Sequence, residues 1–323
     1  MPAGIVAIAA DLTGAPVSSA DFGAIDLTRE WIERRSGISS RHWWPEDVEL
    51  HVPAGRVCNQ VMAGASPGRC TLIVVSTSSS QRVPPLAALV ASAAGLPTDT
   101  LVFDMNSACS GFVAALVTAA SLVDAGQSDS CIVCTVEAMS RVTNRADRKS
   151  AFLFGDGAAA VLIESREHFS PVISRSGTDG SCADLMRDRG SGIELDGMEV
   201  FDHAVTRMQE LAQAAAQDTP RPTAIIPHQA NGRILTATQR GAGVNIPFID
   251  RIAMMGNTSS ASIPLAMYLA LCDGEIPPQG RLAALSYGAG ETWGSASTNY
   301  EVHLAEAATV DQSGAAADRA VPR

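Results

Sequence analysis

The sequence predicts an α/β protein in which helices cover both faces of its strands. Short apolar runs rich in valine, isoleucine and leucine recur along the chain, and they lack the apolar–polar alternation of half-exposed strands. Such runs are typical of strands that are buried on both faces. Alanine-rich stretches of helical character separate them, and the same order of elements returns in the second half. A chain of 323 residues is long enough for two such halves.

The first half contains five such runs, which are the strands that we expect there. They lie at Gly4 to Ala9, Thr71 to Ser76, Leu101 to Asp104, Cys131 to Val136 and Ala158 to Ile163. After the third run, Phe112, Leu116 and Val123 mark one face of a helix. This helix lies in the longest apolar helical stretch of the chain, yet that stretch falls short of the ~20 residues that a bilayer span needs. We therefore expect no membrane-spanning helix.

The second half repeats the pattern, which indicates a duplicated βα unit. Thr223 to Ile226 is an apolar run that ends in a polar turn, as Thr71 to Val75 does in the first half. After a helical stretch, Asn257 to Pro264 opens a helix much as Asn106 to Gly111 does. If the two halves pack face to face, these equivalent turns converge at the junction, where ligand sites of α/β folds tend to lie.

We place the break between the halves near residues 165–170. The predicted organisation is an N-terminal half at residues 1–167, a C-terminal half at residues 168–304 and a tail at residues 305–323. The tail is rich in Ala, Asp and Ser and has no apolar period, so we expect it to be disordered.

Composition excludes several classes of protein. Acidic residues outnumber basic ones, 34 against 23, and the net charge is −11 with no basic stripe; this argues against a nucleic-acid partner. The apolar start lacks the positive region of a signal peptide, and seven scattered cysteines do not resemble a disulfide framework. We expect a cytoplasmic protein that does not act at a membrane.

No metal site is expected. Cys131 and Cys134 have the spacing of a metal or redox pair, but no second pair exists and both lie in an apolar run. The histidines other than His228 show no ligand spacing; they are His42, His51, His168, His203 and His303.

Cys109 is the candidate nucleophile. It lies at a turn between a strand and a helix, where the positive end of the helix is expected to lower the pKa of the thiol. Ala108, Ser110 and Gly111 are small and leave room for a substrate. The alternative is an inert thiol in the core.

His228 and Asn257 are candidates because of where they fall. His228 follows an apolar strand, and Asn257 lies in the turn that opens a helix. Alone, the first would be read as a structural histidine and the second as an ordinary turn or N-cap residue. Their combination with Cys109 is the signal.

Three motifs in this order closely resemble β-ketoacyl-(acyl carrier protein) synthase III. They are Asn106-Ser-Ala-Cys-Ser-Gly-Phe112, Pro227-His-Gln-Ala-Asn231 and Gly256-Asn-Thr-Ser-Ser-Ala-Ser-Ile-Pro264. The resemblance spans nearly the whole chain, with further matches at Phe154-Gly-Asp-Gly-Ala158 and Gly288-Ala-Gly-Glu-Thr-Trp-Gly294. It implies the thiolase fold, a five-layered αβαβα body of two pseudo-symmetric halves, and a homodimer.

The resemblance also implies a mechanism. Cys109 takes an acyl group from acyl-CoA, and a malonyl group on acyl carrier protein then loses carbon dioxide and attacks it. His228 and Asn257 hold the enolate oxygen, and the backbone N–H groups of Cys109 and Ala289 hold the tetrahedral oxyanion. No cofactor is implied, since acyl-CoA is a substrate. Thiolases carry a second catalytic cysteine in their C-terminal loop, and this chain has none after Cys272.

The resemblance also assigns roles to single residues outside the motifs. It implies that Trp31 and Arg141 enclose the adenine of CoA, with Arg35 and Asn231 nearby; plain surface packing of these side chains is the alternative. It assigns docking of the carrier protein to Arg233 and Arg240, which fall on one face of a predicted helix; a solvated helix face without a partner is the alternative. Asp202 stands where the family commonly has a basic residue.

Two positions bear on the acyl pocket. The resemblance assigns it Phe201 and Val83, and Val83 stands where acetyl-preferring members have a bulky phenylalanine. We therefore expect a roomier pocket for a longer or unusual acyl group that primes fatty-acid or polyketide synthesis. Two further hypotheses remain: acyl transfer to a hydroxyl or amine in specialised metabolism, and a scaffold without activity.

Overall fold

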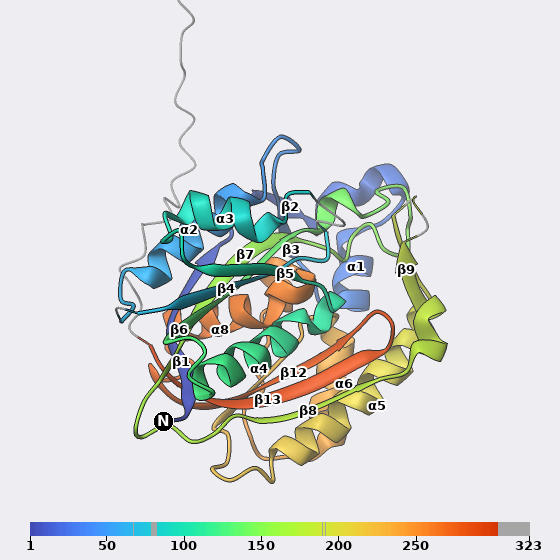
Figure 1. Cartoon of the computed structure of the whole chain (residues 1–323). Helices are drawn as coiled ribbons and strands as arrows, with labels where there is room; N and C mark the ends of the chain where they lie inside the picture. The colour runs from blue at the N-terminus through green and yellow to red at the C-terminus, as the bar shows by residue number, and fades with distance from the viewer. Residues whose placement is uncertain (67, 79–82, 189, 191, 303–323) are drawn as a thin grey trace, which may run out of the picture.

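The structure is a computed structural model that describes residues 1–302 except 67, 79–82, 189 and 191. The tail predicted to be disordered, residues 305–323, lies outside the described residues. Figure 1 shows strands and helices stacked in layers.

The five strands predicted in the first half are all present. They are β1 (Ala3–Asp11), β4 (Cys70–Val75), β5 (Leu101–Met105), β6 (Ser130–Ala138) and β7 (Asp156–Ser165). They pair in the order β5-β4-β6-β7-β1. Every residue of β4 and β6 is buried, as expected of apolar runs that lack alternation. The prediction of an α/β fold is confirmed.

The second half builds the same pairing pattern from its own strands. They are β8 (Ile173–Thr178), β11 (Ala224–Pro227), β12 (Gln279–Gly288) and β13 (Thr292–Glu301). β11 is parallel to β12, and β12, β13 and β8 are then antiparallel neighbours. In the first half β4 is likewise parallel to β6, and β6, β7 and β1 are antiparallel neighbours. The two sets join where Ile5 of β1 pairs with Tyr300 of β13.

Helices form three layers around these strands. The outer layer of the first half is α2 (His51–Met62) and α3 (Leu86–Ala94), the central layer is α4 (Gly111–Asp124) and α8 (Ser262–Cys272), and the outer layer of the second half is α5 (Gly197–Ala215) and α6 (Gly232–Ala242). α4 and α8 are apolar on nearly all sides because strands of both halves pack against them in one hydrophobic core. The order of layers is αβαβα.

Shorter elements complete the fold. They are the strands β2 (Ala15–Ser18), β3 (Ser40–Trp43), β9 (Met186–Asp188) and β10 (Ile193–Leu195), the helices α1 (Arg29–Ser36) and α7 (Ile252–Met255), and the 3₁₀ turns η1 (Ser19–Ile25), η2 (Ala108–Ser110), η3 (Met139–Arg141), η4 (Gly180–Leu185) and η5 (Ser259–Ala261). None of the helices in the described part of the chain has the length and apolar character needed to cross a membrane. Cys131 and Cys134 are buried in β6 with free thiols.

Candidate active site

Cys109 lies in η2, where the chain turns from β5 into α4. Ala108 has a φ of 46°, a backbone conformation that is costly for a residue with a Cβ and that turns the chain sharply. Gly288 at the end of β12 packs so closely that an added Cβ would lie 2.9 Å from Cys109 N. Cys109 is therefore held between the two halves.

The pKa of the Cys109 thiol differs from our sequence-based expectation. We expected the positive end of α4 to lower it. In the structure only 6% of Cys109 is exposed, and burial raises the pKa to about 11, while a hydrogen bond with Ser259 opposes that rise. Desolvation of the thiolate outweighs the helix end because the turn is covered by the second half of the chain.

His228 follows β11 and is buried. Burial lowers its pKa to about 4, so the ring is neutral at physiological pH. Its Nδ1 lies 2.6 Å from Ser262 Oγ, and that oxygen already accepts the Gln229 N–H at 3.3 Å. The Ser262 hydroxyl hydrogen can then be donated to Nδ1, which leaves the ring proton on Nε2.

Asn257 is fixed by its backbone and by one side-chain oxygen. Its N–H donates to Leu153 O at 2.8 Å and its carbonyl accepts from Gly155 N at 3.0 Å, so it sits against the Phe154-Gly-Asp-Gly motif of the first half. Its Oδ1 accepts the Ser259 N–H at 2.9 Å. The amide hydrogens of Nδ2 are thereby left to meet a ligand.

The turns of Cys109 and Asn257 are related by the internal repeat. Ser259 opens η5 with a φ of 49°, as Ala108 opens η2 with 46°, and a helix of the central layer follows each turn. Ser259 Oγ lies 3.5 Å from Cys109 Sγ. The duplicated unit predicted from the sequence thus brings its two equivalent turns into contact.

Glu137 is a residue of this junction that sequence reasoning missed. It is buried at the end of β6, where it accepts the N–H groups of Thr77 and Ser78 and the N–H and O–H groups of Ser260. No motif marks Glu137 in the sequence, because it is a single acidic residue at the end of an apolar run. It ties the loop after β4 to the turn that carries Asn257.

One cavity of about 1110 Å³ brings the predicted triad together. Cys109, His228 and Asn257 all line it. The guanidinium of Arg35 lies 5.9 Å from the Trp31 ring at the wall of this cavity. The wall also includes other predicted site residues, namely Trp31, Arg35, Asn231, Phe201 and Arg233.

Other predicted positions lie away from this cavity lining. Arg141 donates to Pro45 O and Val48 O and is not among the lining residues. Val83 is fully exposed and Arg240 is exposed on α6. Ala289 lies in the turn between β12 and β13, where its carbonyl accepts from Thr292 Oγ1 at 3.3 Å.

Three basic residues at the cavity were missed: Arg148, Lys149 and Arg187. Arg148 also bonds the backbone carbonyl of Asp26 at 3.0 Å. The sequence-based expectation placed the basic residue at Arg141, a few positions earlier in the same segment. The segment between β6 and β7 turns back on itself, and spacing along the chain does not reveal which of its arginines reaches the cavity.

Known proteins are similar to this chain in sequence and in architecture. A model of 3-oxoacyl-(acyl carrier protein) synthase III matches residues 103–180, and a model of its C-terminal part matches residues 213–300. The β-ketoacyl-(acyl carrier protein) synthase III of Rhodobacter capsulatus is 36% identical, over 86% of this chain and 93% of that protein. The chain belongs to this synthase III family. The resemblance seen in its motifs is confirmed.

Solved structures agree with the synthase III assignment. The 3-oxoacyl-(acyl carrier protein) synthase III of Pseudomonas aeruginosa PAO1 is 30% identical with a TM-score of 0.85, over 93% of this chain and 98% of that chain. The priming β-ketosynthase of the R1128 polyketide pathway is 28% identical with a TM-score of 0.85, over 92% and 96%. The thiolase fold is confirmed. This synthase III is an enzyme of the acyltransferase class and of the priming ketosynthase type, and simple transfer to a hydroxyl or amine is not favoured.

Proposed function

We propose that this chain primes fatty-acid or polyketide synthesis by joining an acyl group from acyl-CoA to a malonyl group on acyl carrier protein. The observation that carries this proposal is the shared cavity of Cys109, His228 and Asn257. A sulfur nucleophile next to two neutral hydrogen-bond donors suits acyl capture followed by decarboxylation. The reaction needs no resident cofactor, because acyl-CoA is consumed as a substrate.

In the first step Cys109 Sγ attacks the thioester carbonyl. A bond forms between that sulfur and the acyl carbon, the bond to the CoA sulfur breaks, and the thiol proton ends on the departing CoA. Because burial raises the pKa of the Cys109 thiol to about 11, the thiolate is scarce near neutral pH. Ser259, at 3.5 Å from Sγ, is a donor that can stabilise the thiolate when it forms.

In the second step the malonyl thioester loses carbon dioxide, and the electron pair of the broken bond moves into an enolate. We assign its oxygen to the Nε2–H of His228 and the Nδ2–H of Asn257. His228 is neutral because burial lowers its pKa to about 4, and a neutral ring donates a hydrogen bond to the enolate oxygen without transferring its proton to it. The enolate carbon then attacks the acyl carbon on Cys109. The new carbon–carbon bond replaces the bond between that carbon and Sγ, and the released thiolate takes a proton from solvent, which restores the Cys109 thiol.

The oxyanion formed in either attack would be held by backbone donors. We propose the N–H groups of Cys109 and Ala289 for this role. Gly288 brings the β12–β13 turn against Cys109, since a Cβ added to Gly288 would lie only 3.1 Å from Cys109 Cβ. Such contact keeps the two backbone segments close, and the donors are thereby fixed before the reaction starts.

The CoA portion would enter past Trp31 and Arg35. These residues line the cavity together with Arg148 and Lys149, and guanidinium and ammonium groups are suited to the phosphates of CoA. We assign the basic role that we had given to Arg141 to Arg148. Trp31 packs edge-on against Phe152, with ring centroids 5.4 Å apart, which supports its ring as a platform for the adenine.

The carrier protein would dock beside this entrance. Arg233 and Arg240 lie on α6 and are both exposed, and acyl carrier protein is acidic. Arg233 also borders the cavity, so a carrier protein bound there could deliver its malonyl group. We expect Arg233→Glu to weaken use of malonyl carrier protein more than Arg240→Glu does.

A homodimer in the cytoplasm is the assembly that we propose. β5 ends the strand order, so its outer edge has no neighbouring strand among the described residues, and Leu101 on it is 57% exposed. An open strand edge of this kind pairs readily with another chain. Sedimentation analysis at micromolar concentration checks this expectation, and a monomer there contradicts it.

The acyl group that we propose is longer than acetyl. Val83 is fully exposed and offers no bulky ring to close the acyl pocket. Turnover of acetyl-CoA is to be compared with that of four- to eight-carbon acyl-CoAs. A strong preference for acetyl-CoA would end this part of the proposal.

Intact-protein mass spectrometry tests the reaction itself. After exposure to acyl-CoA we expect one acyl adduct, absent in Cys109→Ala and present in Cys272→Ser, which removes an exposed thiol elsewhere. Addition of malonyl carrier protein then discharges the adduct as a β-keto product. Discharge only to an alcohol or amine supports simple acyl transfer, and failure of wild-type protein to form an adduct contradicts both.

A further inference from the structure

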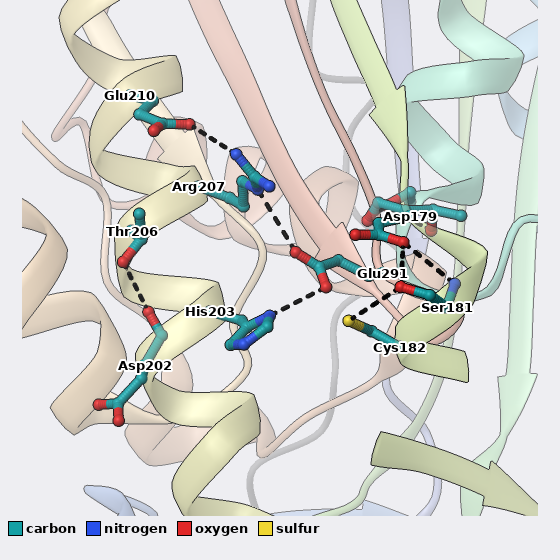
Figure 2. Close-up of polar contacts among 11 residues, drawn as sticks. Asp179, Ser181, Cys182, Asp202, His203, Thr206, Arg207, Glu210 and Glu291 are labelled. Atoms are coloured by element: carbon teal, nitrogen blue, oxygen red, sulfur yellow. Dashed lines mark hydrogen bonds and ion pairs between the residues drawn. The ribbon is translucent and has the colours of Figure 1, made fainter. Parts of the chain in front are cut away.

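A second cluster of reactive side chains lies outside the proposed active site. Cys182 of η4, His203 of α5 and Glu291 of the β12–β13 turn point toward one another in Figure 2. Each offers one ligand atom, and these atoms all lie within 4.8 Å of one another. The cluster therefore joins three segments that are far apart in the sequence.

Glu291 is the buried centre of this cluster. Only 3% of its side chain is exposed, and its φ is 44°, so the turn holds the carboxylate inward at some cost in backbone strain. Its Oε2 lies 2.9 Å from His203 Nδ1. The Glu291 carboxylate is thus held toward the imidazole of His203.

Cys182 and His203 are reachable from solvent. Both are partly exposed, whereas Glu291 is buried, and 38% of the His203 side chain is exposed. Cys182 Sγ lies 3.9 Å from Ser181 Oγ and close to the Glu291 carboxylate. An ion could therefore enter from the open side, with the carboxylate at the bottom.

The charges nearby favour a cation. Arg207 lies 3.4 Å from the other oxygen of Glu291, Oε1, and is shared with Glu210; its guanidinium also stacks over the Trp293 ring at 4.2 Å. Asp179 is bonded to Ser181 and adds a further negative charge close to His203 and Arg207. The negative charges of Glu291, Asp179 and Glu210 therefore exceed the positive charge of Arg207 among these labelled side chains (Figure 2).

We propose that Cys182 Sγ, His203 Nδ1 and Glu291 Oε2 bind a zinc ion. Sulfur, imidazole nitrogen and carboxylate oxygen are the three donor types that zinc takes, whereas magnesium and calcium prefer oxygen alone. Tetrahedral zinc needs its ligand atoms about 3.3–3.8 Å apart, which small side-chain movements provide here. Binding releases the thiol proton to solvent, moves the His203 ring proton to Nε2, and leaves the fourth position to water.

The ion would connect the wall of the cavity to the turn beside Cys109. η4 and α5 carry Asp184 and Phe201, which line the cavity, and Glu291 lies three residues after Gly288, which packs on Cys109. Bound zinc would hold these segments together and stabilise the fold. This site does not depend on the proposed reaction, because its ligands are not the residues assigned to catalysis.

Cobalt(II) is the probe for this site. Purified full-length protein is stripped with a chelator and titrated with Co²⁺, and we expect one equivalent to give the intense near-ultraviolet band of a cobalt–thiolate bond. Zn²⁺ then displaces the cobalt and abolishes the band. Competition with a coloured chelator measures the affinity for zinc, and thermal unfolding with and without zinc measures the stabilisation.

Variants assign the signal to the cluster. Cys182→Ser removes the band, and His203→Gln weakens zinc binding by at least about 100-fold, the upper end of what loss of an outer-shell partner costs. Cys272→Ser, which removes an exposed thiol elsewhere, leaves both unchanged. Cys109→Ala also keeps the band, which separates this site from the active-site thiol. A band that persists in Cys182→Ser, or no thiolate band in the wild-type protein, overturns the proposal.

Discussion

Ser259 Oγ lies 3.5 Å from Cys109 Sγ, so a hydroxyl from the second half of the chain touches the candidate nucleophile of the first. The same Ser259 hydroxyl lies 3.0 Å from Thr77 Oγ1, which fixes its position. Burial raises the pKa of the Cys109 thiol, and this contact is the hydrogen bond that most opposes the rise. The contact therefore makes ionisation of the sulfur easier than burial alone would allow.

Replacing this hydroxyl should slow acyl loading. In Ser259→Ala the thiolate loses a donor, and a hydrogen bond to a charged group contributes about 1.5 kcal/mol or more, so we expect loading near neutral pH to fall about tenfold. The pH at which loading reaches half its maximum should also move upward. Rapid-quench mass spectrometry of the adduct measures both. Ser121→Ala, a change on the exposed surface of α4, should alter neither.

The stability of the protein should depend on His228 in mildly acidic solution. The pKa of His228 in the folded state is about 4, below the value near 6.5 of an unfolded chain. Between these values the unfolded state binds the extra proton, so stability is full above pH 6.5 and is lost as the pH falls toward 4. Between pH 7 and pH 5 this group should cost about 2 kcal/mol of unfolding free energy.

His228→Gln isolates that contribution. Because the variant has no imidazole to protonate, its unfolding free energy should fall by about 2 kcal/mol less than that of the wild type between pH 7 and pH 5. Denaturant titrations at the two pH values give the comparison. The two proteins have all other titrating groups in common, so the contributions of those groups cancel. Parallel losses in the two proteins would mean that His228 is not held neutral by burial.

Gly288 should tolerate no side chain. A Cβ there would lie 2.9 Å from Cys109 N and 3.1 Å from Cys109 Cβ, so the nucleophile or the turn must move. A displacement of about 1 Å costs on the order of 100-fold in rate, and we expect a loss of that size in Gly288→Ala. Gly23→Ala is the matched control, because an added Cβ there meets nothing within 4 Å. Equal activity of the two variants would contradict the close approach.

Arg148 and Arg141 should differ in their effect on acyl-CoA. Arg148 lines the cavity, and its contacts with Asp26 are exposed, so it is available to a phosphate. Arg148→Ala should raise KM for acyl-CoA about tenfold, the worth of one charge-assisted hydrogen bond. Arg141→Ala should leave KM within about twofold, since its guanidinium is engaged by Pro45 O and Val48 O. Steady-state kinetics of the two variants measures both KM values. A larger rise of KM in Arg141→Ala than in Arg148→Ala would support the original assignment of Arg141 to CoA binding.

Local sequence was sufficient for the strands and for the positions of the two key turns. The runs at residues 71–76 and 131–136 have no polar alternation and form β4 and β6, which are buried on both faces. Small and capping residues around Cys109 and Asn257 predicted sharp turns into helices, and both occur. The repeat between them was visible because equivalent turns keep the same residue types in the same order.

Distances between residues remote in the sequence depended on the tertiary structure. Nothing in the spacing of Cys182, His203 and Glu291 marks them as neighbours, because three separate segments bring them together. The choice of Arg148 over Arg141 likewise depends on how one loop folds back.

The sequence by itself determined the α/β class, which follows from the periodicity of its apolar runs. The order of its three motifs determined the family resemblance, and that resemblance implied the αβαβα fold and the candidate triad. Only the tertiary structure decided the direction of the Cys109 pKa shift. The helix end that we expected to lower that pKa is a local feature, whereas the burial that raises it is produced by the other half of the chain closing over the turn. Desolvation depends on everything packed around a group, and no local pattern encodes it.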